Sequence, residues 1–301
     1  MNKNMEYYIV DSETAIKMKD VAFCITNNNE PQNIKPLYQT DDTALYNADC
    51  MDIMAALPDN YIDMIFADPP YNLSNDGITC HAGKMVSVNK GEWDKSNGFE
   101  KDLKFHEKWI TECKRILKPE GTIWISGTNH SIYQCGFLLQ KLGFHILNDI
   151  SWFKPNAAPN LACTTFAHSH ETLLWAKKDK KAKHIFNYEK MKNGIFKEDK
   201  MKIPNKQMRS VWSIPTPLPD EKTFGKHPTQ KPLALLKRII SSSTNDGSLI
   251  LDPFNGGGTT GVAAKFIGNR KYIGIDIEKE YIALTINRLN QLNLQNTLFN
   301  L

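Results

Sequence analysis

The sequence predicts an α/β fold in which helices cover both faces of a parallel sheet. Short apolar runs with strand character alternate with longer segments whose apolar residues recur at helical spacing. Glycines and prolines separate these segments, and several apolar runs end at or just before an aspartate. Strands that alternate with helices pair in parallel, because each crossover helix returns the chain to the same edge of the sheet.

The pattern of elements begins after residue 40. Earlier residues have weak apolar periodicity, and we interpret residues 1–40 as an N-terminal arm. A Lys-Pro-Glu-Gly run after residue 117 ends one predicted helix, and Gly143 closes the next. In the first half of the chain, the predicted strands are 44–47, 64–67, 122–126, 146–153 and 172–176, and the predicted helices are 52–57, 103–117 and 131–142.

The second half carries the same alternation. Residues 228–243 are expected to contain a helix with Pro232 near its first turn and an apolar face. The remaining elements are strands 249–251 and 270–275 and helices 260–266 and 278–292. One segment breaks the alternation: residues 72–98 hold four glycines and are too long for an ordinary connection, which predicts a functional or mobile loop.

Composition excludes several classes of protein. The 301 residues are 41% hydrophobic, enough for one core with or without an appended lobe. The N-terminus lacks the pattern of a signal peptide, and no apolar run is long enough to span a bilayer, so we expect a cytoplasmic protein. The six cysteines form no C-x-x-C pair, and His168 and His170 have no cysteine or paired acid nearby. We therefore expect no metal site.

Positive charge is concentrated in one segment. The net charge is +4, but residues 177–209 hold twelve lysines and arginines against four acids, a local charge of +8. Such a run can be an ordinary solvated face. It also suits a polyanion such as nucleic acid, because this segment has little apolar periodicity.

The sequence LDPFNGGGTTG, residues 251–261, predicts a ligand-binding turn between a strand and a helix. Glycines let a ligand approach the backbone closely. The turn is not G-x-G-x-x-G and has no Walker lysine, and Asp252 is a better neighbour for a cation than for a pyrophosphate. Asp276 ends the next strand, where an acid can accept both hydroxyls of a ribose. A ligand with a positive end and a ribose fits S-adenosylmethionine, although a purely structural turn remains an alternative.

The sequence DPPY, residues 68–71, follows an apolar strand and predicts a site for a nucleobase amino group. Such an amino group is a poor nucleophile, because its lone pair is delocalised into the ring. A carboxylate and a backbone carbonyl that accept its two N–H bonds would free that lone pair. The prolines fix the backbone, and the tyrosine ring can stack on an extruded base. A plain strand-ending turn is the alternative.

These motifs and their order resemble the amino-group DNA methyltransferases, which modify adenine at N6 or cytosine at N4. DPPY is their catalytic motif, and FNGGGTTG is similar to their cofactor motif F-x-G-S-G-T, with Gly257 in place of the serine. DPPY precedes the glycine motif by about 180 residues, a circularly permuted order typical of the β group, as is HPTQKP at residues 227–232. The resemblance implies a permuted, Rossmann-like S-adenosylmethionine-dependent methyltransferase sheet.

Four stretches narrow the resemblance further, namely DPPYNLSNDGI, GKMVSVNKGEWDK, WISGTNHSIY and HETLLWAKK. They are most similar to the second methyltransferase of Dpn- and Mbo-type restriction systems. The resemblance then implies a type II enzyme that methylates adenine in GATC, on single- or double-stranded DNA. The acid in DPPY favours adenine, because cytosine-N4 relatives more often carry serine there.

The resemblance also implies roles for individual residues. The residues that would hold and stack the target adenine are Asp68, Pro69, Pro70 and Tyr71. Those around the methionine half of the cofactor would be Asp252, Phe254, Gly256, Gly258 and Thr259. Asp276 would bind the ribose, Asp49 would lie near the cofactor adenine, and Lys231 near the methionine carboxylate.

The expected organisation is an N-terminal arm (1–40), a catalytic half (41–176), a basic target-recognition segment (177–226) and a cofactor-binding half (227–301). DNA is the expected partner, and the resemblance leaves a homodimer open. Three other functions stay open from the residues: a methyltransferase acting on cytosine N4 or on RNA, an NAD-dependent dehydrogenase, and a DNA-binding module without catalysis. The dehydrogenase leaves DPPY unexplained.

Overall fold

A computed structural model describes residues 25–27, 30–32, 35–71, 78–81, 84–87 and 94–299 of the chain. Within these ranges nine strands form one sheet, in the order β11-β9-β10-β8-β5-β12-β13-β4-β3. Their bounds are β3 (Tyr38–Gln39), β4 (Thr43–Asn47), β5 (Ile62–Ala67), β8 (Leu117–Gly127), β9 (His145–Phe153), β10 (His170–Lys177), β11 (Val211–Ser213), β12 (Leu249–Asp252) and β13 (Lys271–Asp276).

The centre of the sheet is parallel, as predicted. Strands β4, β13, β12, β5 and β8 all run in one direction, so their carboxyl ends meet at one edge. Two strands depart from the predicted parallel pairing. β10 is antiparallel to β8 and β9, and β3 is antiparallel to β4. A loop, and not a crossover helix, joins β9 to β10 and β3 to β4. Such a connection allows antiparallel pairing.

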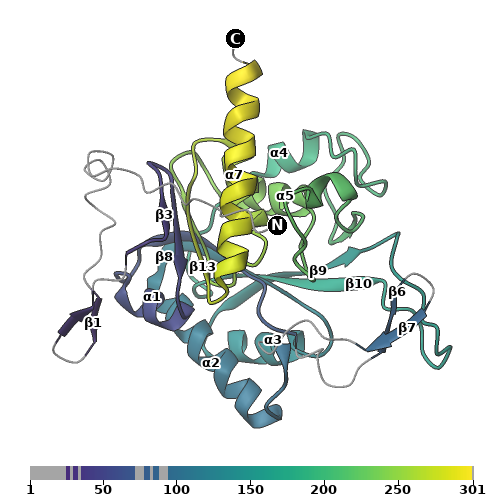
Figure 1. Ribbon diagram of the computed structural model, residues 1–301, viewed down its shortest axis with the longest axis horizontal. Helices are drawn as coiled ribbons and strands as arrows, with labels where there is room; N and C mark the ends of the chain where they lie inside the picture. Colours follow the sequence, from purple (N-terminus) through teal and green to yellow (C-terminus); the bar gives the residue numbers. More distant parts are fainter. Residues whose placement is uncertain are drawn as a thin grey trace, which may run out of the picture.

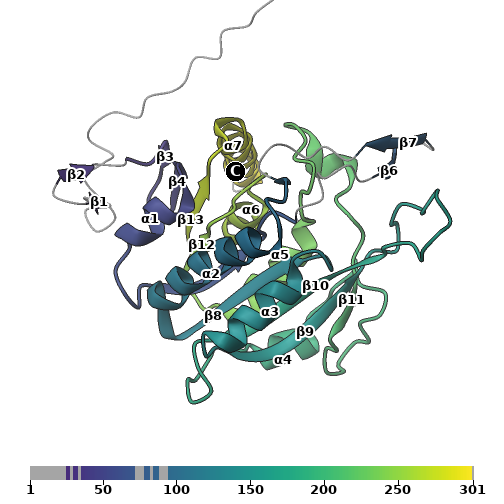
Figure 2. The ribbon, with the colours of Figure 1, turned by 90° about the horizontal axis from the view of Figure 1, so that it is seen from below.

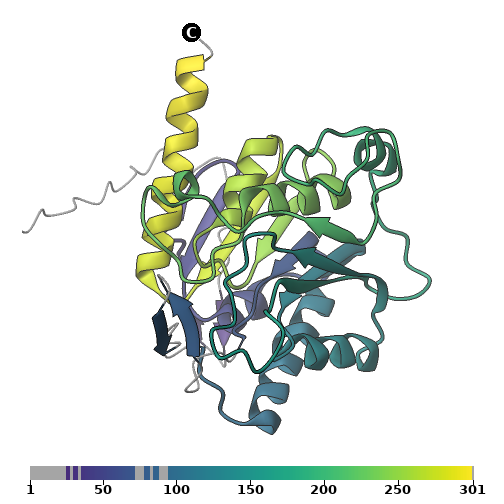
Figure 3. The same ribbon diagram turned by 90° about the vertical axis from the view of Figure 1, so that its right-hand side faces the viewer.

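Helices cover both faces of the sheet (Figures 1 and 2). One face packs against α1 (Cys50–Ala56), α2 (Phe99–Ile116) and α3 (Ile132–Lys141). The other packs against α5 (Leu233–Ser243), α6 (Thr259–Ile267) and α7 (Lys279–Phe299), with α4 (Tyr188–Asn193) beside α5. The last turns of α7 extend beyond the rest of the molecule (Figure 3). Among the described helices, none has the length and apolarity needed to cross a bilayer.

Strand β5 shows why the sheet is buried on both faces. Its side chains alternate, so that Ile65 and Ala67 enter the core under α1–α3 while Met64 and Phe66 enter the core under α5–α7. All four are buried. The run of apolar residues from Met64 to Ala67 therefore lies in the middle of three layers, and it leads directly to Asp68 at the carboxyl end of the strand.

Two element boundaries differ from the prediction for local reasons. The helix predicted from residue 103 begins at Phe99, because Asp102 accepts hydrogen bonds from the Ser96 hydroxyl and the Asn97 N–H and so fixes the preceding turn. The strand predicted from residue 122 begins at Leu117, which pairs with Ile62 across an irregularity in the ladder. The Lys-Pro-Glu-Gly run is therefore an irregular part of a strand and not a turn.

The later helices and the two irregular segments can also be compared with their predictions. Residues 228–243 contain the predicted helix, which begins at Leu233 with Pro232 as its N-cap, and the last helix continues beyond its predicted end to Phe299. The predicted loop 72–98 contains an antiparallel hairpin of β6 (Ile78–His81) and β7 (Lys84–Ser87), apart from the main sheet (Figure 1). In the predicted arm, β1 (Ile25–Asn27) pairs with β2 (Glu30–Gln32). Residues 1–24 and most of that loop lie outside the described ranges.

Candidate active site

The carboxyl edge of the parallel strands holds a cavity of about 250 Å³. Asp68 follows β5, Asp252 ends β12 and Asp276 ends β13, and all three line this cavity. Asp49, two residues after β4, lines it as well. β12 connects through α6 to β13 on one side, whereas β5 connects through α2 to β8 on the other. The cavity thus lies where the strand order reverses, the usual ligand site of such sheets.

The glycine turn after β12 needs its glycines for shape. Gly256 and Gly258 have φ values of +49° and +70°, which side chains disfavour. A Cβ atom on Gly258 would lie 2.3 Å from the Thr285 side chain, and one on Gly256 would lie 3.1 Å from the His227 ring. Gly256 lines the cavity, whereas Gly258 does not line it and instead lets the turn pack closely against Thr285 on α7. At Gly257 the nearest atom is 3.3 Å away, so this position is less restricted.

Two acids are held by groups close to them in the turn. Asp252 accepts hydrogen bonds from the Phe254 N–H at 3.1 Å and the Thr260 hydroxyl at 2.5 Å. Asp276 accepts from the Gly256 N–H at 2.7 Å and the Glu278 N–H at 2.9 Å. Burial raises the pKa of Asp252 to about 7 and that of Asp276 to about 6. Both carboxylates would therefore gain from a cationic or hydroxyl-bearing ligand.

The remaining predicted cofactor residues also lie at this cavity. Asp49 caps α1 by accepting from the Met51 N–H at 2.8 Å. Phe254 packs edge-on against Trp109, with ring centroids 5.4 Å apart. The Thr259 hydroxyl accepts from Arg288, which also donates to the Gly257 carbonyl. Arg288 was missed by sequence reasoning, because it lies on α7, far from any motif.

Asp68 is enclosed by side chains. Its Oδ1 accepts from the Tyr71 hydroxyl at 2.5 Å, and its Oδ2 accepts from the Lys231 ammonium at 2.5 Å. Burial raises the pKa of Asp68, Lys231 lowers it and Glu171 raises it further, with a net rise. The Tyr71 N–H donates to Asp94 at 2.9 Å and fixes the backbone after the two prolines, both of which line the cavity.

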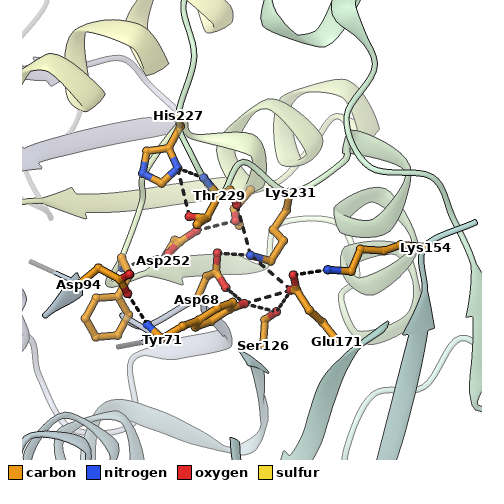
Figure 4. A network of polar contacts seen from close by, with 12 residues as sticks. Asp68, Tyr71, Asp94, Ser126, Lys154, Glu171, His227, Thr229, Lys231 and Asp252 are labelled. Atoms are coloured by element: carbon orange, nitrogen blue, oxygen red, sulfur yellow. Dashed lines mark hydrogen bonds and ion pairs between the residues drawn. The ribbon is translucent and has the colours of Figure 1, made fainter. Parts of the chain in front are cut away.

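A wider polar network surrounds the ion pair of Asp68 and Lys231 (Figure 4). Glu171, on β10, accepts from Lys154 at 2.8 Å and lies 3.6 Å from the Lys231 ammonium. The Tyr71 hydroxyl lies 2.9 Å from the Ser126 hydroxyl and 3.1 Å from Glu171. Sequence reasoning missed Glu171, Lys154 and Ser126. The one available signal was a buried-strand glutamate in HETLLW, an unusual residue beside an apolar run.

Two predicted roles stay untested by this geometry. Lys231 was expected near the cofactor carboxylate, and here its ammonium pairs with Asp68 and Glu171. Tyr71 was expected to stack on a base, and here its side chain is 4% exposed with the Lys231 ammonium 5.0 Å from the ring centroid. Among the described residues, no group of three or more histidine, cysteine or acidic side chains is arranged for a metal ion.

The basic segment is divided between the two edges of the sheet. Lys178 donates to Asn60 and to the Leu117 carbonyl, at the amino ends of β5 and β8. These positions lie on the edge opposite Asp68. β11 then runs parallel to β9 and returns the chain to the cavity edge, where His227 and Lys231 lie. The segment is thus not one lobe beside the cavity.

These features define a class of protein. A permuted Rossmann-like sheet carries a bare glycine turn, an acid on the next strand and an acid–proline–proline–tyrosine turn on one cavity, as in S-adenosylmethionine-dependent methyltransferases. A family model described as DNA methylase (N6_N4_Mtase) matches residues 62–287. The chain belongs to this DNA methylase family, which confirms the family expected from the motifs.

Individual relatives cover most of the chain. It is 50% identical over 263 residues to the type II methyltransferase M2.DpnII of Streptococcus pneumoniae, covering 87% of this chain and 95% of that protein. It is 48% identical over 263 residues to the type II methyltransferase M2.MboI of Moraxella bovis, covering 86% and 92%. The chain is thus a relative of type II restriction–modification methyltransferases.

Solved structures share the fold. The crystal structure of the M1.HpyAVI–SAM complex matches with a TM-score of 0.58 and 30% identity, covering 82% of this chain and 100% of that one. The PvuII DNA methyltransferase, described as cytosine-N4-specific, matches with a TM-score of 0.64 and 19% identity, covering 84% and 88%. The second match shows a common fold and carries no conclusion on the target base.

Proposed function

We propose that the protein transfers the methyl group of S-adenosylmethionine to N6 of adenine in GATC, in single- or double-stranded DNA, within a type II restriction–modification system. The observation that carries this proposal is that Asp68, Asp252 and Asp276 line one cavity. The close relatives M2.DpnII and M2.MboI support the choice of adenine, as does the acid in DPPY.

The cofactor fits the glycine-turn half of this cavity. A Cβ atom on Gly256 would lie 3.1 Å from the ring of His227, which also lines the cavity, so a glycine keeps this side of the site open. Asp276 would accept the ribose hydroxyls, and Asp252 and Asp49 would line the rest of the site with Phe254 and Thr259. When bound, the cofactor supplies a methyl group on a positively charged sulfur.

The DPPY half of the cavity would orient the nucleophile. Asp68 and the Pro69 carbonyl would each accept one N–H bond of the adenine amino group, which draws the nitrogen towards a tetrahedral geometry. Pro70 would keep the backbone carbonyl directed into the site, and Tyr71 would contact the face of the extruded base. The proton that nitrogen loses after methylation would pass to solvent, with no covalent enzyme intermediate.

The larger assembly follows from the same proposal. DNA would lie across the cavity edge, with salt-dependent phosphate contacts from lysines and arginines of the 177–226 segment. Residues 41–176 and 227–301 would act as the catalytic and cofactor-binding halves of one domain, in the cytoplasm. The active protein would be a monomer or a homodimer, since relatives in the β group can dimerise.

Mass spectrometry of digested nucleosides tests the proposal. The protein is incubated with S-adenosylmethionine and matched oligonucleotides with and without GATC, single- and double-stranded. We expect N6-methyladenine only in the GATC samples. N4-methylcytosine would instead make the protein a cytosine-N4 enzyme. If no methylated nucleoside forms, including with random genomic DNA, the proposal of catalysis fails.

A further inference from the structure

The carboxylate assigned to the target amino group is already occupied. Both oxygens of Asp68 accept hydrogen bonds at 2.5 Å, one from the Tyr71 hydroxyl and one from the Lys231 ammonium. Its side chain is 15% exposed and that of Lys231 is 5% exposed. An incoming amino group therefore competes with two strong donors that are part of the protein.

A second carboxylate lies within reach of both donors. Glu171 Oε2 is 3.1 Å from the Tyr71 hydroxyl and 3.6 Å from the Lys231 ammonium. Its other oxygen is fixed by Lys154 at 2.8 Å. Figure 4 shows the Lys231 ammonium between the two carboxylates. A small movement of one side-chain tip would thus exchange one acceptor for the other.

The Tyr71 hydroxyl has the same choice. A phenol carries one proton and can donate to only one acceptor at a time. In this structure its shorter contact is to Asp68, and Glu171 is the alternative. The Ser126 hydroxyl, 2.9 Å from the Tyr71 oxygen, can reorient its own proton to match either state.

We propose that Glu171 is a positioning residue. It accepts hydrogen bonds from the Lys231 ammonium and the Tyr71 hydroxyl when the target amino group binds to Asp68. The inference rests on the proposed function. Glu171 keeps the two displaced donors paired inside the protein, so that Asp68 becomes available to the amino N–H without leaving a buried ammonium unpaired.

The charges explain why the second acceptor is a glutamate. Asp68, Lys231, Glu171 and Lys154 alternate in sign along the network and sum to zero. Moving Lys231 towards Glu171 leaves this sum unchanged, so the exchange needs no proton from outside. A neutral glutamine would offer an oxygen acceptor without attracting the ammonium away from Asp68.

The test compares two DNA substrates that differ only in the amino group. A GATC duplex that the wild-type protein methylates is prepared with either adenine or purine, which lacks the 6-amino group, at the target position. The dissociation constant of each duplex is measured in the presence of S-adenosylhomocysteine, which cannot donate a methyl group. The purine-to-adenine ratio of the two constants is compared for the wild type and Glu171→Gln. Duplex stability contributes equally for both proteins and cancels.

We expect Glu171→Gln to lower this ratio by about ten-fold, because adenine loses affinity while purine does not. A merely structural role would weaken both duplexes alike and leave the ratio unchanged. Glu112→Gln, a part-buried glutamate paired with Arg115 on α2, is the matched control and should keep the wild-type ratio. A ratio in Glu171→Gln within about two-fold of wild type would overturn the inference.

A second variant keeps the test informative if Glu171→Gln does not fold. Glu171→Gln combined with Lys154→Met removes one charge of each sign, so it restores the balance around Asp68 and Lys231. It should lose the discrimination in the same way, and retention of the wild-type ratio would contradict the inference. Failure of the proposed function is seen separately, because the wild-type protein would then methylate no adenine.

Discussion

The two halves of the cavity hold their carboxylates differently. Around the glycine turn, Asp252 and Asp276 accept hydrogen bonds from backbone N–H groups and a hydroxyl, within two to twenty residues along the chain. Around DPPY, Asp68 is held by Lys231, which is 163 residues away, and the network continues through Glu171. The first half is built from local turn geometry, and the second from side chains on separate elements.

Under the proposed function, this difference separates cofactor binding from methyl transfer. Acids held by neutral donors keep a need for positive charge, which a cationic cofactor meets. The acid held by an ammonium is already compensated, and so a neutral amino group must compete for it. Changes in the two halves should therefore affect cofactor affinity and turnover separately.

The largest expected effect is on turnover, in Asp68→Ala. Without the carboxylate the target nitrogen keeps its delocalised lone pair, and we expect the rate of methyl transfer to fall by about a thousand-fold or more. Cofactor affinity should change by no more than about three-fold, because the glycine turn is untouched. Radiolabelled methyl transfer and calorimetric cofactor binding measure the two quantities.

Asp59→Ala supplies the control for that variant. Asp59 is an exposed acid in the turn before β5 and pairs with Arg115. It should leave both quantities near wild type. If Asp68→Ala retains turnover while remaining folded, the assignment of Asp68 is wrong.

The second effect is on cofactor affinity, in Gly258→Ala. Its φ of +70° is strained for alanine, and the added Cβ would overlap Thr285 at 2.3 Å. We expect the turn to shift and cofactor affinity to fall by about a hundred-fold, with the target-base site intact.

Gly268→Ala is the matched control, since φ there is +77° but a Cβ would meet nothing within 4 Å. Its stability should fall by about 1 kcal/mol, the cost of alanine at a positive φ, and its cofactor affinity should stay unchanged. Equal loss of affinity in both variants would mean that the glycine turn does not shape the cofactor site. Thermal unfolding and calorimetry separate these outcomes.

The same contrast explains what could be predicted from sequence. The glycine turn, Asp252 and Asp276 were predictable, because each strand end and its turn are read within a few consecutive residues. The short apolar runs similarly predicted β5, β12 and β13. The glutamate in HETLLW is unusual as a residue type, but the role of Glu171 was not predictable, because it depends on β10 being antiparallel and so placing its first residues at the cavity edge. No local pattern states which way a strand runs.

The prediction of one basic lobe from the charge distribution failed for the same reason. Counting residues in the 177–209 run treats it as one surface, whereas Lys178 is bound at the amino ends of β5 and β8. Position along the chain says nothing about which edge of the sheet a lysine occupies. Fold class was predictable from periodicity, and the partners of buried charges were not.

A smaller effect is expected on the pH dependence of cofactor binding. Burial, with Asp68 and Asp276 nearby, raises the pKa of Asp252 to about 7. If the ionised form binds the cationic cofactor, affinity should fall by about ten-fold between pH 8 and pH 6. Asp252→Asn should remove most of this dependence and leave the smaller part that comes from Asp276, whose pKa is about 6. Calorimetry across that range is the measurement. A flat wild-type profile would contradict it.

Stability should move in the opposite direction with pH. The folded pKa of Asp252 lies above its ordinary value of 3.8, so the folded state holds the proton more tightly than the unfolded state does. The contribution of this group to stability is then present below about pH 4 and is lost as pH rises to about 7. Thermal unfolding of Asp252→Asn and wild type without cofactor should therefore diverge as pH rises, with the variant the more resistant.

The smallest expected effect compares two lysines of the 177–226 segment. Lys226 precedes His227 at the cavity edge and is exposed, whereas Lys178 is bound to the Leu117 carbonyl at the opposite edge. If DNA lies across the cavity edge, Lys226→Gln should weaken DNA binding by about three-fold and reduce the salt slope by about one. Lys178→Gln should change neither, because a strand of about 20 Å separates it from the DNA.

Fluorescence anisotropy with one GATC duplex, repeated across a salt series, measures both variants under identical conditions. The two substitutions remove the same charge from the same segment, so net charge and long-range attraction are matched. A difference between them therefore reports position alone. Equal weakening would mean that DNA wraps round both edges of the sheet, and a larger loss in Lys178→Gln would place the DNA-binding face on the amino edge, away from Asp68.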